Sequence, residues 1–223
     1  MGRNRRPVRL VVRDIGGDEL MLYFVNWDGD MSKWPAWYGL LRSPRKYWPG
    51  MVKREAHRLW CGDNDAFHGL FSPDAFLGML DKMRPYADRC VFVACPDVVG
   101  DCAATLELWC EWAGQIMDEG YVPAFVCQDG QDPETIPAVA EVLFIGGSTE
   151  FKMGAGARAC IAEGKKRVAW VHVGRVNSQR RLAYFSSLGV DSSDGTTINR
   201  GPEVKRRLLD SQLNQRSLQG TTR

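Results

Sequence analysis

Two carboxylates stand three residues apart late in the chain, in the segment Leu188-Gly189-Val190-Asp191-Ser192-Ser193-Asp194-Gly195-Thr196. An apolar lead precedes them and Gly195 follows, a pattern typical of a buried strand that ends in a tight turn. Two separated carboxylates can together carry out a displacement at an acetal-like carbon: one attacks or stabilises that carbon, and the other moves protons on the leaving or entering group. The alternative is that Asp191 and Asp194 only cap the next loop.

Five other polar clusters follow apolar runs along the chain, at residues 63–67, 96–101, 128–130, 146–150 and 172–177. If the runs are parallel strands, these clusters meet at one face, because the C-terminal ends of such strands lie together. Six polar ends in succession favour a polar small-molecule pocket over ordinary turn chemistry. An aspartate, a glutamine and a Gly-Gly turn among them match the donors and acceptors of a purine edge.

The elements that must position these groups alternate between strand and helix. Strand-like runs lie at 90–95, 122–127, 142–145, 168–173 and 189–192, with one more near Trp60. Helical segments are expected at 72–83, 101–119, 154–164, 177–188 and 202–213. Such repetition indicates a parallel sheet covered by helices.

The N-terminal runs 9–12 and 19–25 predict a hairpin, because their link is too short for a parallel crossover. With 223 residues, the chain fits a compact or incomplete (β/α)8 barrel of the TIM type in one domain over residues 1–213. An open doubly wound sheet is the alternative. The polar tail at 214–223 is expected to be disordered.

Residues 26–58 are rich in Trp, Pro, Gly and Arg and show no clear period, which predicts a long functional loop with at most a short helix. Arg42, Arg45, Lys46 and Arg54 are interleaved there with tryptophan and tyrosine. Basic and aromatic side chains mixed in this way suit phosphate contact combined with base stacking. The alternative is a solvated loop whose aromatic side chains cover one end of a barrel.

Composition excludes several classes of protein. The net charge is +2, and no apolar run approaches the roughly 20 residues that span a bilayer, so we expect a cytoplasmic protein without a membrane partner. The seven cysteines form no CxxC pair, and only three histidines are present, so neither a disulfide framework nor a metal site is expected. Neither a Gly-x-Gly-x-x-Gly segment nor a P-loop occurs, so no cofactor is expected.

Residues 63–196 resemble the tRNA-guanine transglycosylase superfamily, and most of all its phage and bacterial branch, the 7-deazaguanine DNA transglycosylases. Gly189-Val190-Asp191-Ser192-Ser193-Asp194 is similar to that superfamily's Gly-[Ile/Val]-Asp-x-x-Asp segment, whose second acid is the nucleophile. The resemblance implies that Asp194 is the nucleophile and that Asp191 is a supporting acid at the substrate.

The segment Asp63-Asn64-Asp65-Ala66-Phe67 is similar to the family's Asp-Ser-Gly-Gly-Phe, although Asn64 and Asp65 replace two small residues. By position, the resemblance implies that Asp63 is the general acid/base and places Phe67 at the substrate.

The remaining family positions fall at the ends of middle strands. Asp97, Gln128, Gly146 and Gly147 match the residues that hold the base edge, with one residue inserted after Gln128. Val173-Gly174-Arg175-Val176 resembles Met-Gly-Val-Gly, with Arg175 as a departure that we assign to the nucleic-acid strand.

A second departure is the missing zinc subdomain, because the Cys-x-Cys-x-x-Cys segment with its following histidine does not occur after Cys160. The resemblance therefore implies DNA as the partner, with a flipped-out guanine exchanged for a 7-deazaguanine such as the 7-cyano form. Three alternatives remain: the same chemistry on RNA, a glycosidase that only removes a base, and a non-catalytic module that binds modified DNA.

Overall fold

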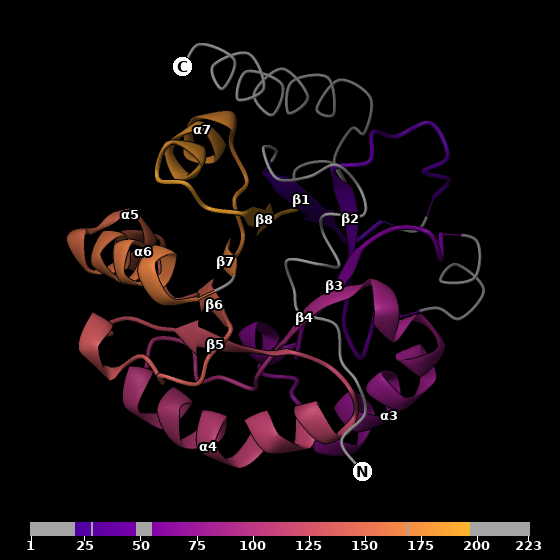
Figure 1. The fold of residues 1–223 in the computed structure, drawn as a ribbon, viewed down its shortest axis with the longest axis horizontal. Helices are drawn as coiled ribbons and strands as arrows, with labels where there is room; N and C mark the ends of the chain where they lie inside the picture. The colour runs from indigo at the N-terminus through magenta and orange to yellow at the C-terminus, as the bar shows by residue number, and fades with distance from the viewer. Residues whose placement is uncertain (1–20, 28, 48–54, 169, 197–223) are drawn as a thin grey trace.

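The computed structural model describes residues 21–27, 29–47, 55–168 and 170–196. Within them, eight parallel strands close into a barrel in sequence order, with β8 pairing back onto β1. Figure 1 shows the helices arranged outside this ring of strands. The strands are β1 (Leu22–Val25), β2 (Tyr38–Arg42), β3 (Trp60–Gly62), β4 (Cys90–Ala94), β5 (Pro123–Cys127), β6 (Val142–Ile145), β7 (Trp170–Val173) and β8 (Ser192–Asp194).

Helices cover the outside of the barrel from β3 onward. Most of them begin at a side chain that caps the first turn: the Asp101 carboxylate accepts from Ala104 N at 3.0 Å, and Ser148 Oγ accepts from Phe151 N at 3.0 Å. The α-helices are α3 (Pro73–Met83), α4 (Cys102–Asp118), α5 (Thr149–Met153), α6 (Ala155–Arg167) and α7 (Gln179–Ser187). The 3-10 helices are η1 (Ala66–His68), η2 (Arg84–Arg89) and η3 (Pro133–Thr135).

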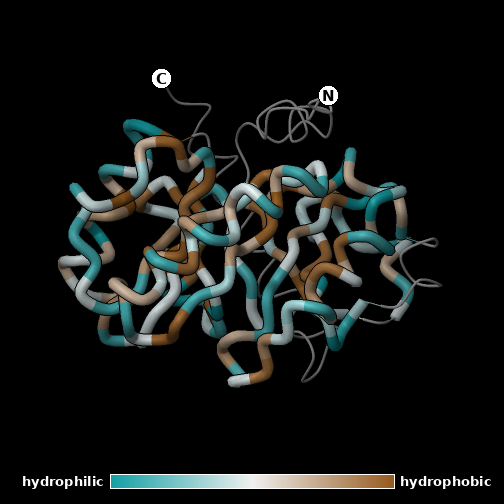
Figure 2. Tube along the Cα trace, turned by 90° about the horizontal axis from the view of Figure 1, so that it is seen from below, coloured by the Kyte–Doolittle hydropathy of each residue, from teal (hydrophilic) through white to brown (hydrophobic). Residues whose placement is uncertain are grey.

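The hydrophobic core has two layers, as expected where a closed sheet is wrapped by helices. One layer packs the helices onto the outer face of the sheet and includes Trp109, Phe125 and Phe185. The other includes Phe24 and Phe92, whose rings meet edge to face at 6.1 Å. Hydrophobic and hydrophilic segments alternate along the chain, as that division requires (Figure 2).

The predicted (β/α)8 barrel is confirmed, and it is closed rather than incomplete. The predicted hairpin is wrong for Leu22–Val25, because both edges of β1 are taken by parallel neighbours. Its other half, 9–12, lies outside the described residues, as do the expected helix 202–213 and the tail 214–223. No helix among the described residues is long and apolar enough to cross a membrane.

The predicted strand pattern differs from the structure most at β2 and at the last strand. Residues 26–58 are not one continuous loop, because Tyr38–Arg42 forms β2 between β1 and β3. The last strand begins at Ser192 instead of 189, because Gly189 adopts a left-handed φ of 76° just after α7 and the chain turns there. Asp191 therefore precedes β8 and Asp194 ends it.

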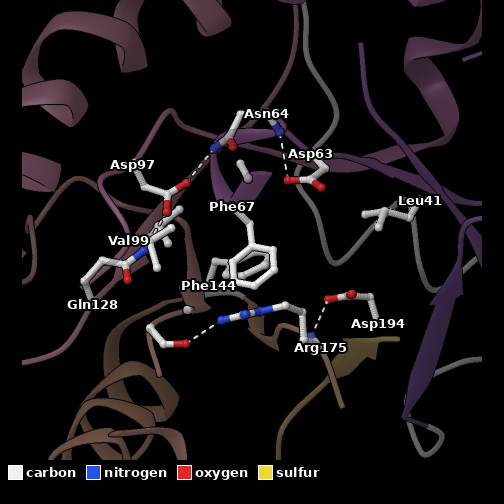
Figure 3. Close-up of a pocket in the computed structure, with 14 residues that line it drawn as sticks. Leu41, Asp63, Asn64, Phe67, Asp97, Val99, Gln128, Phe144, Arg175 and Asp194 are labelled. Carbon is white, nitrogen blue, oxygen red and sulfur yellow. Dashed lines mark hydrogen bonds between the residues drawn. The ribbon is translucent and has the colours of Figure 1, made fainter. Parts of the chain in front are cut away.

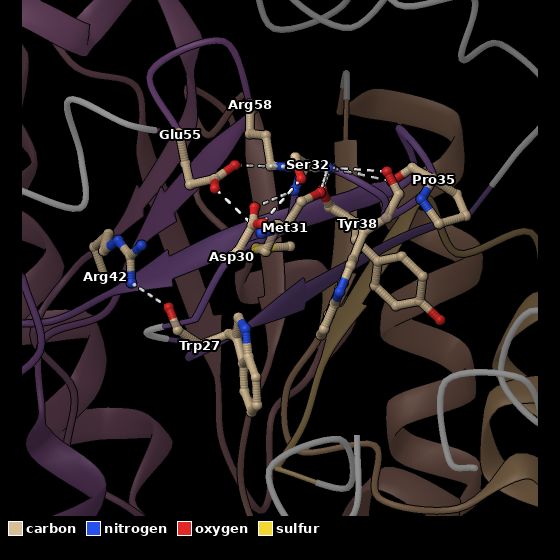
Figure 4. Close-up of polar contacts among 10 residues, drawn as sticks. Trp27, Asp30, Met31, Ser32, Pro35, Tyr38, Arg42, Glu55 and Arg58 are labelled. Carbon is tan, nitrogen blue, oxygen red and sulfur yellow. Dashed lines mark hydrogen bonds and ion pairs between the residues drawn. The ribbon is translucent and has the colours of Figure 1, made fainter. Parts of the chain in front are cut away.

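A buried ion pair ties the segment between β1 and β2 to the barrel (Figure 4). Arg58 Nε donates to Glu55 at 3.2 Å, and Arg58 Nη1 donates to the carbonyls of Pro35 and Tyr38 at 3.1 Å each. Arg58 Nη2 also donates to Met31 O. Burial lowers the pKa of Arg58, and Glu55 opposes that effect. The guanidinium thus replaces the regular hydrogen bonds that this irregular segment lacks.

Replacing Arg58 with Met should lower the free energy of unfolding by about 3–5 kcal/mol, because Glu55 and the carbonyls lose their buried donor. Urea denaturation followed by circular dichroism measures the change. Lys166→Met is the control: its side chain is 71% exposed, so a change within about 0.5 kcal/mol is expected. Equal effects of the two substitutions would contradict the structural role of Arg58.

Candidate functional site

A polar pocket opens at the C-terminal ends of the strands, as expected for a barrel of this type (Figure 3). Its lining combines three aspartates, two side-chain amides and one arginine with apolar side chains and a Gly-Gly turn. The lining residues are Leu41, Asp63, Asn64, Phe67, Ala94, Asp97, Val99, Val126, Gln128, Phe144, Gly146, Gly147, Arg175 and Asp194.

Asp194 is the last residue of β8, and two donors hold its Oδ1. His172 Nε2 lies 3.0 Å from it and Arg175 N donates to it at 3.1 Å. A Cβ at position 195 would meet Val176 O at 2.6 Å, so only glycine fits directly after Asp194. The carboxylate is thus fixed at the point where the chain turns away from the barrel.

His172 is fully buried on β7 and is oriented from its other nitrogen. Trp170 Nε1 donates to Ser192 Oγ at 2.8 Å, and Ser192 Oγ lies 2.8 Å from His172 Nδ1. Because the Asp194 carboxylate can only accept, the hydrogen of this contact is carried by His172 Nε2, and Nδ1 can then accept from the Ser192 hydroxyl. The ring packs at 4.6 Å from Phe144 and 5.0 Å from Phe92.

Asp63 follows β3 and differs in environment from Asp194. Burial raises its pKa to about 7, with further contributions from the charges of Asp194 and Asp65, while the Asn64 N–H opposes the shift. Asp65 takes a left-handed φ of 62° and accepts from Arg45 N at 3.1 Å, which fixes the turn after Asp63. A carboxyl group with a pKa near neutrality suits proton transfer in either direction.

Asp97 is the centre of an amide network on the opposite wall. Asn64 Nδ2 donates to its Oδ1 at 2.8 Å and Gln128 Nε2 donates to its Oδ2 at 2.6 Å. Gln128 Oε1 accepts in turn from Gly100 N at 3.0 Å. Burial raises the pKa of Asp97, and the Asn64 hydrogen bond and Arg175 oppose that effect.

The Gly146–Gly147 turn closes the pocket beside Gln128. A Cβ at Gly146 would lie 2.9 Å from Val126 Cγ1, and Gly147 has a left-handed φ of 72°. Asp129 fixes the turn by accepting from Ser148 N at 2.7 Å. Although burial opposes it, hydrogen bonding from Ser148 lowers the pKa of Asp129.

Arg175 crosses the pocket rather than projecting into solvent. Its guanidinium lies 3.7 Å from the centre of the Phe67 ring, and Nη2 donates to Gly147 O. Arg175 has a left-handed φ of 58°, a backbone conformation that is unfavourable for residues other than glycine. The hydrogen bond from Arg175 N to Asp194 maintains it here. Figure 3 shows the guanidinium between Phe67 and the β-strand ends.

The structure brings most of the predicted site residues into one pocket: Asp63, Phe67, Asp97, Gln128, Gly146, Gly147 and Asp194. Asp191 is the exception. It directly precedes β8, roughly 10 Å of extended chain away from Asp194. There its carboxylate forms an ion pair with Lys165 at 2.7 Å and accepts from Val171 N at 2.8 Å. The predicted role of Asp191 at the substrate is therefore corrected to a structural role.

The residues assigned to a nucleic-acid strand are divided by the structure. Arg42 is 1% exposed and donates to Trp27 O at 3.4 Å, so its assignment to a nucleic-acid strand is corrected to a buried, structural position. Arg45 and Lys46 are exposed just after β2, at the end of the barrel where the pocket opens. Arg175 lies inside the pocket. Arg54 lies outside the described residues.

The sequence assigns no function to Asn64, His172 or Lys152. In the sequence, Asn64 is visible only as a departure from a motif, and nothing there indicates that His172 contacts Asp194. The sequence allows Lys152 to reach either the pocket rim or Glu150, and in the structure its Nζ donates to the backbone carbonyl of Gly174 instead. Among the described residues, no group of three or more His, Cys, Asp or Glu is placed to hold a metal ion.

No known protein family and no curated protein sequence matches the chain. Solved structures do match it. Phosphoribosyl anthranilate isomerase from Thermus thermophilus is 13% identical, with a TM-score of 0.55 over 88% of this chain and 99% of its own. For 3-hexulose-6-phosphate synthase from Salmonella typhimurium the identity is 15% and the TM-score 0.53, over 88% and 100%. Tryptophan synthase from M. tuberculosis is 10% identical, with a TM-score of 0.50 over 96% and 98%. These similarities show a TIM-type barrel, a fold that often carries enzymes, and assign no reaction.

Replacing Asp63 with Asn should make stability depend less on pH. The unfolded aspartate loses its proton near the ordinary pKa of 3.8, whereas the folded one keeps it to about 7, so rising pH favours unfolding of the wild type across that window. The variant should match the wild type below about pH 4 and exceed it by about 1–4 kcal/mol above pH 7.

Calorimetric unfolding from pH 3.5 to 8 measures this difference. Asp74→Asn, at an exposed position in the first turn of α3, is the matched control and should show no comparable gain. A constant offset for Asp63→Asn across the whole range would contradict the raised pKa of Asp63.

Proposed function

We propose that this protein is a transglycosylase that exchanges a guanine in DNA for a 7-deazaguanine, through a covalent aspartyl intermediate. The observation that carries the proposal is the pair Asp63 and Asp194: two carboxyl groups in one pocket, placed in different environments. A fixed carboxylate beside a carboxyl group that titrates near neutral pH is the division of labour that displacement at a glycosidic carbon requires.

In the first step, an Asp194 carboxylate oxygen attacks C1′ of the nucleotide and the C1′–N9 bond breaks. The electron pair of that bond passes to N9 of guanine, which takes the proton of Asp63 and leaves. In the second step, Asp63, now ionised, accepts the N9 proton of the incoming base. Its N9 attacks C1′, the ester bond breaks, and Asp194 returns to a carboxylate. Protons and electron pairs balance over the cycle, with no net redox change.

Recognition of the base is assigned to the wall opposite Asp194. The Asp97 carboxylate provides acceptors for the N–H groups of a guanine-type edge, and the Gln128 amide offers both a donor and an acceptor. Phe67, half exposed at the pocket mouth, supplies an aromatic face on which a planar base can stack. This chemistry selects a purine-like heterocycle over a sugar phosphate.

A guanine paired inside a duplex cannot present C1′ to a pocket at the end of a barrel, so the nucleotide must be flipped out at a cost of a few kcal/mol. Arg45 and Lys46 are exposed near the pocket opening and are the described residues that we assign to the phosphate backbone.

Incubation with labelled guanine should transfer the label into duplex or single-stranded DNA and not into tRNA. The products are separated by polymer before counting, and 7-cyano-7-deazaguanine should compete with the label. Label in tRNA would move the proposal to RNA. Abasic sites without incorporation would indicate a glycosidase, and DNA binding without any exchange would indicate a recognition module.

Replacing Asp194 with Asn should reduce exchange by at least about 10⁴-fold and abolish a denaturant-stable DNA adduct, because the nucleophile is lost. Asp191→Asn is the matched control from the same segment. It should keep exchange within about threefold, because Asp191 precedes β8 and does not line the pocket. Equal losses in both variants, measured in folded protein by single-turnover kinetics, would remove Asp194 as the nucleophile.

A further inference from the structure

Lys152 is a buried ammonium group that the proposed reaction does not use. It lies in α5 with 5% of its surface exposed, and its Nζ donates to Gly174 O at 2.8 Å. Among the described residues it forms no ion pair within 4.0 Å. Because a buried charge is costly unless something compensates it, an ammonium group held on the Gly174 carbonyl calls for a specific role.

The contact of Lys152 leads to Asp194 through a single peptide unit. The carbonyl of the Gly174–Arg175 peptide accepts from Lys152, and the N–H of the same peptide donates to Asp194 Oδ1 at 3.1 Å. A cation on the carbonyl oxygen polarises the peptide and makes its N–H a stronger donor, because hydrogen bonds in series reinforce one another.

Other contacts hold this peptide close to Asp194. Gly174 N donates to Ile145 O at 3.1 Å, and Val176 N donates to Asp194 O at 2.6 Å. A Cβ at position 174 would approach the Phe144 ring to 2.7 Å, so glycine is needed there. The left-handed Arg175 is the strained point of the segment, and Lys152 fixes the carbonyl immediately before it.

We propose that Lys152 is a positioning residue for Asp194: its ammonium group holds the Gly174–Arg175 peptide in the orientation that keeps the carboxylate aimed at C1′. The inference rests on the proposed function, because it assigns Asp194 as the attacking group. It adds a cationic residue of α5 that acts through the backbone and touches no substrate.

The same arrangement makes the effect depend on pH. Burial and the charge of Arg175 lower the pKa of Lys152 to about 8, while Asp194 opposes the shift. Two other charged groups affect this pKa: Arg181 on α7 lowers it, and Asp129 after β5 raises it. Nζ is therefore charged below about pH 8 and neutral above it, where its hold on the carbonyl weakens.

His172 reports on Asp194 without any need for catalysis, because its Nε2 contacts the same Oδ1. Its ring signals, assigned among the three histidines with His172→Gln, should be followed by NMR from pH 6.5 to 9.5. We expect these signals to show a transition near pH 8 in the wild type. The transition should be absent from Lys152→Met, which has no charge to lose, and from Lys152→Arg, whose guanidinium stays charged over this pH range. Lys166→Met, on the exposed surface, should keep the transition.

Exchange kinetics provide the second measurement. Lys152→Met should lower kcat about 10- to 100-fold with KM changed less than about threefold, because the nucleophile is misplaced while base binding is kept. Lys152→Arg should recover part of that loss. The ratio of the wild-type rate to the Lys152→Arg rate should fall above pH 8, because only the wild type loses the charge at position 152. The titration of Asp63 is common to both proteins and cancels in this ratio.

Unchanged His172 signals in folded Lys152→Met, or a wild-type transition that persists in Lys152→Arg, would overturn the role of Lys152. If no exchange is found with any base but the His172 transition follows Lys152, the proposed reaction fails while the coupling of Lys152 to Asp194 stands. If Lys152→Met does not fold, Lys152→Arg decides the question by the same two measurements.

Discussion

The site depends on one buried hydrogen bond, from His172 to Asp194. A carboxylate at the mouth of a barrel would sample several orientations if only solvent contacted it. Here the Trp170 indole and Ser192 hydroxyl orient His172 from Nδ1, and the rings of Phe92 and Phe144 fix its plane. Because these partners lie in the apolar interior, the hydrogen bond is stronger than it would be in water. Asp194 is therefore preorganised before any ligand arrives.

The pocket gives different environments to carboxyl groups that are chemically identical. Asp63 is set apart by burial and by the charge of Asp194, which together bring its pKa to about 7. Asp97 has both oxygens engaged by amide donors, so it is suited to binding instead of proton transfer. Arg175 places a positive charge among these acids. The charged form of its guanidinium is favoured by four of them: Asp194, Asp97, Asp63 and Asp129. Division of roles among like groups is a common basis of acid–base catalysis.

Parallel closure of the sheet brings these groups together from distant points in the chain. Every strand ends at the same rim, so residues that follow β3, β4, β5 and β6 face the end of β8. The cost of the arrangement is irregular backbone at the rim, at Asp65 and Arg175, both with left-handed φ. Side-chain and backbone hydrogen bonds to Arg45 and Asp194 hold these two turns in place.

The sequence by itself determined the alternation of strands and helices, the barrel and the aspartates, glutamine and glycines at its rim, because periodicity and strand-end polarity are local properties. It did not predict β2, since Gly39 and Arg42 interrupt the apolar run there. It placed the last strand three residues too early, since β8 is Ser-Ser-Asp and is buried only because the barrel encloses it. Tertiary structure alone decided that Asp191 lies before β8 and Asp194 at its end, and that Arg42 is buried. It also decided that Lys152 reaches Gly174, because that contact joins residues 22 positions apart through a backbone carbonyl that no side-chain pattern records.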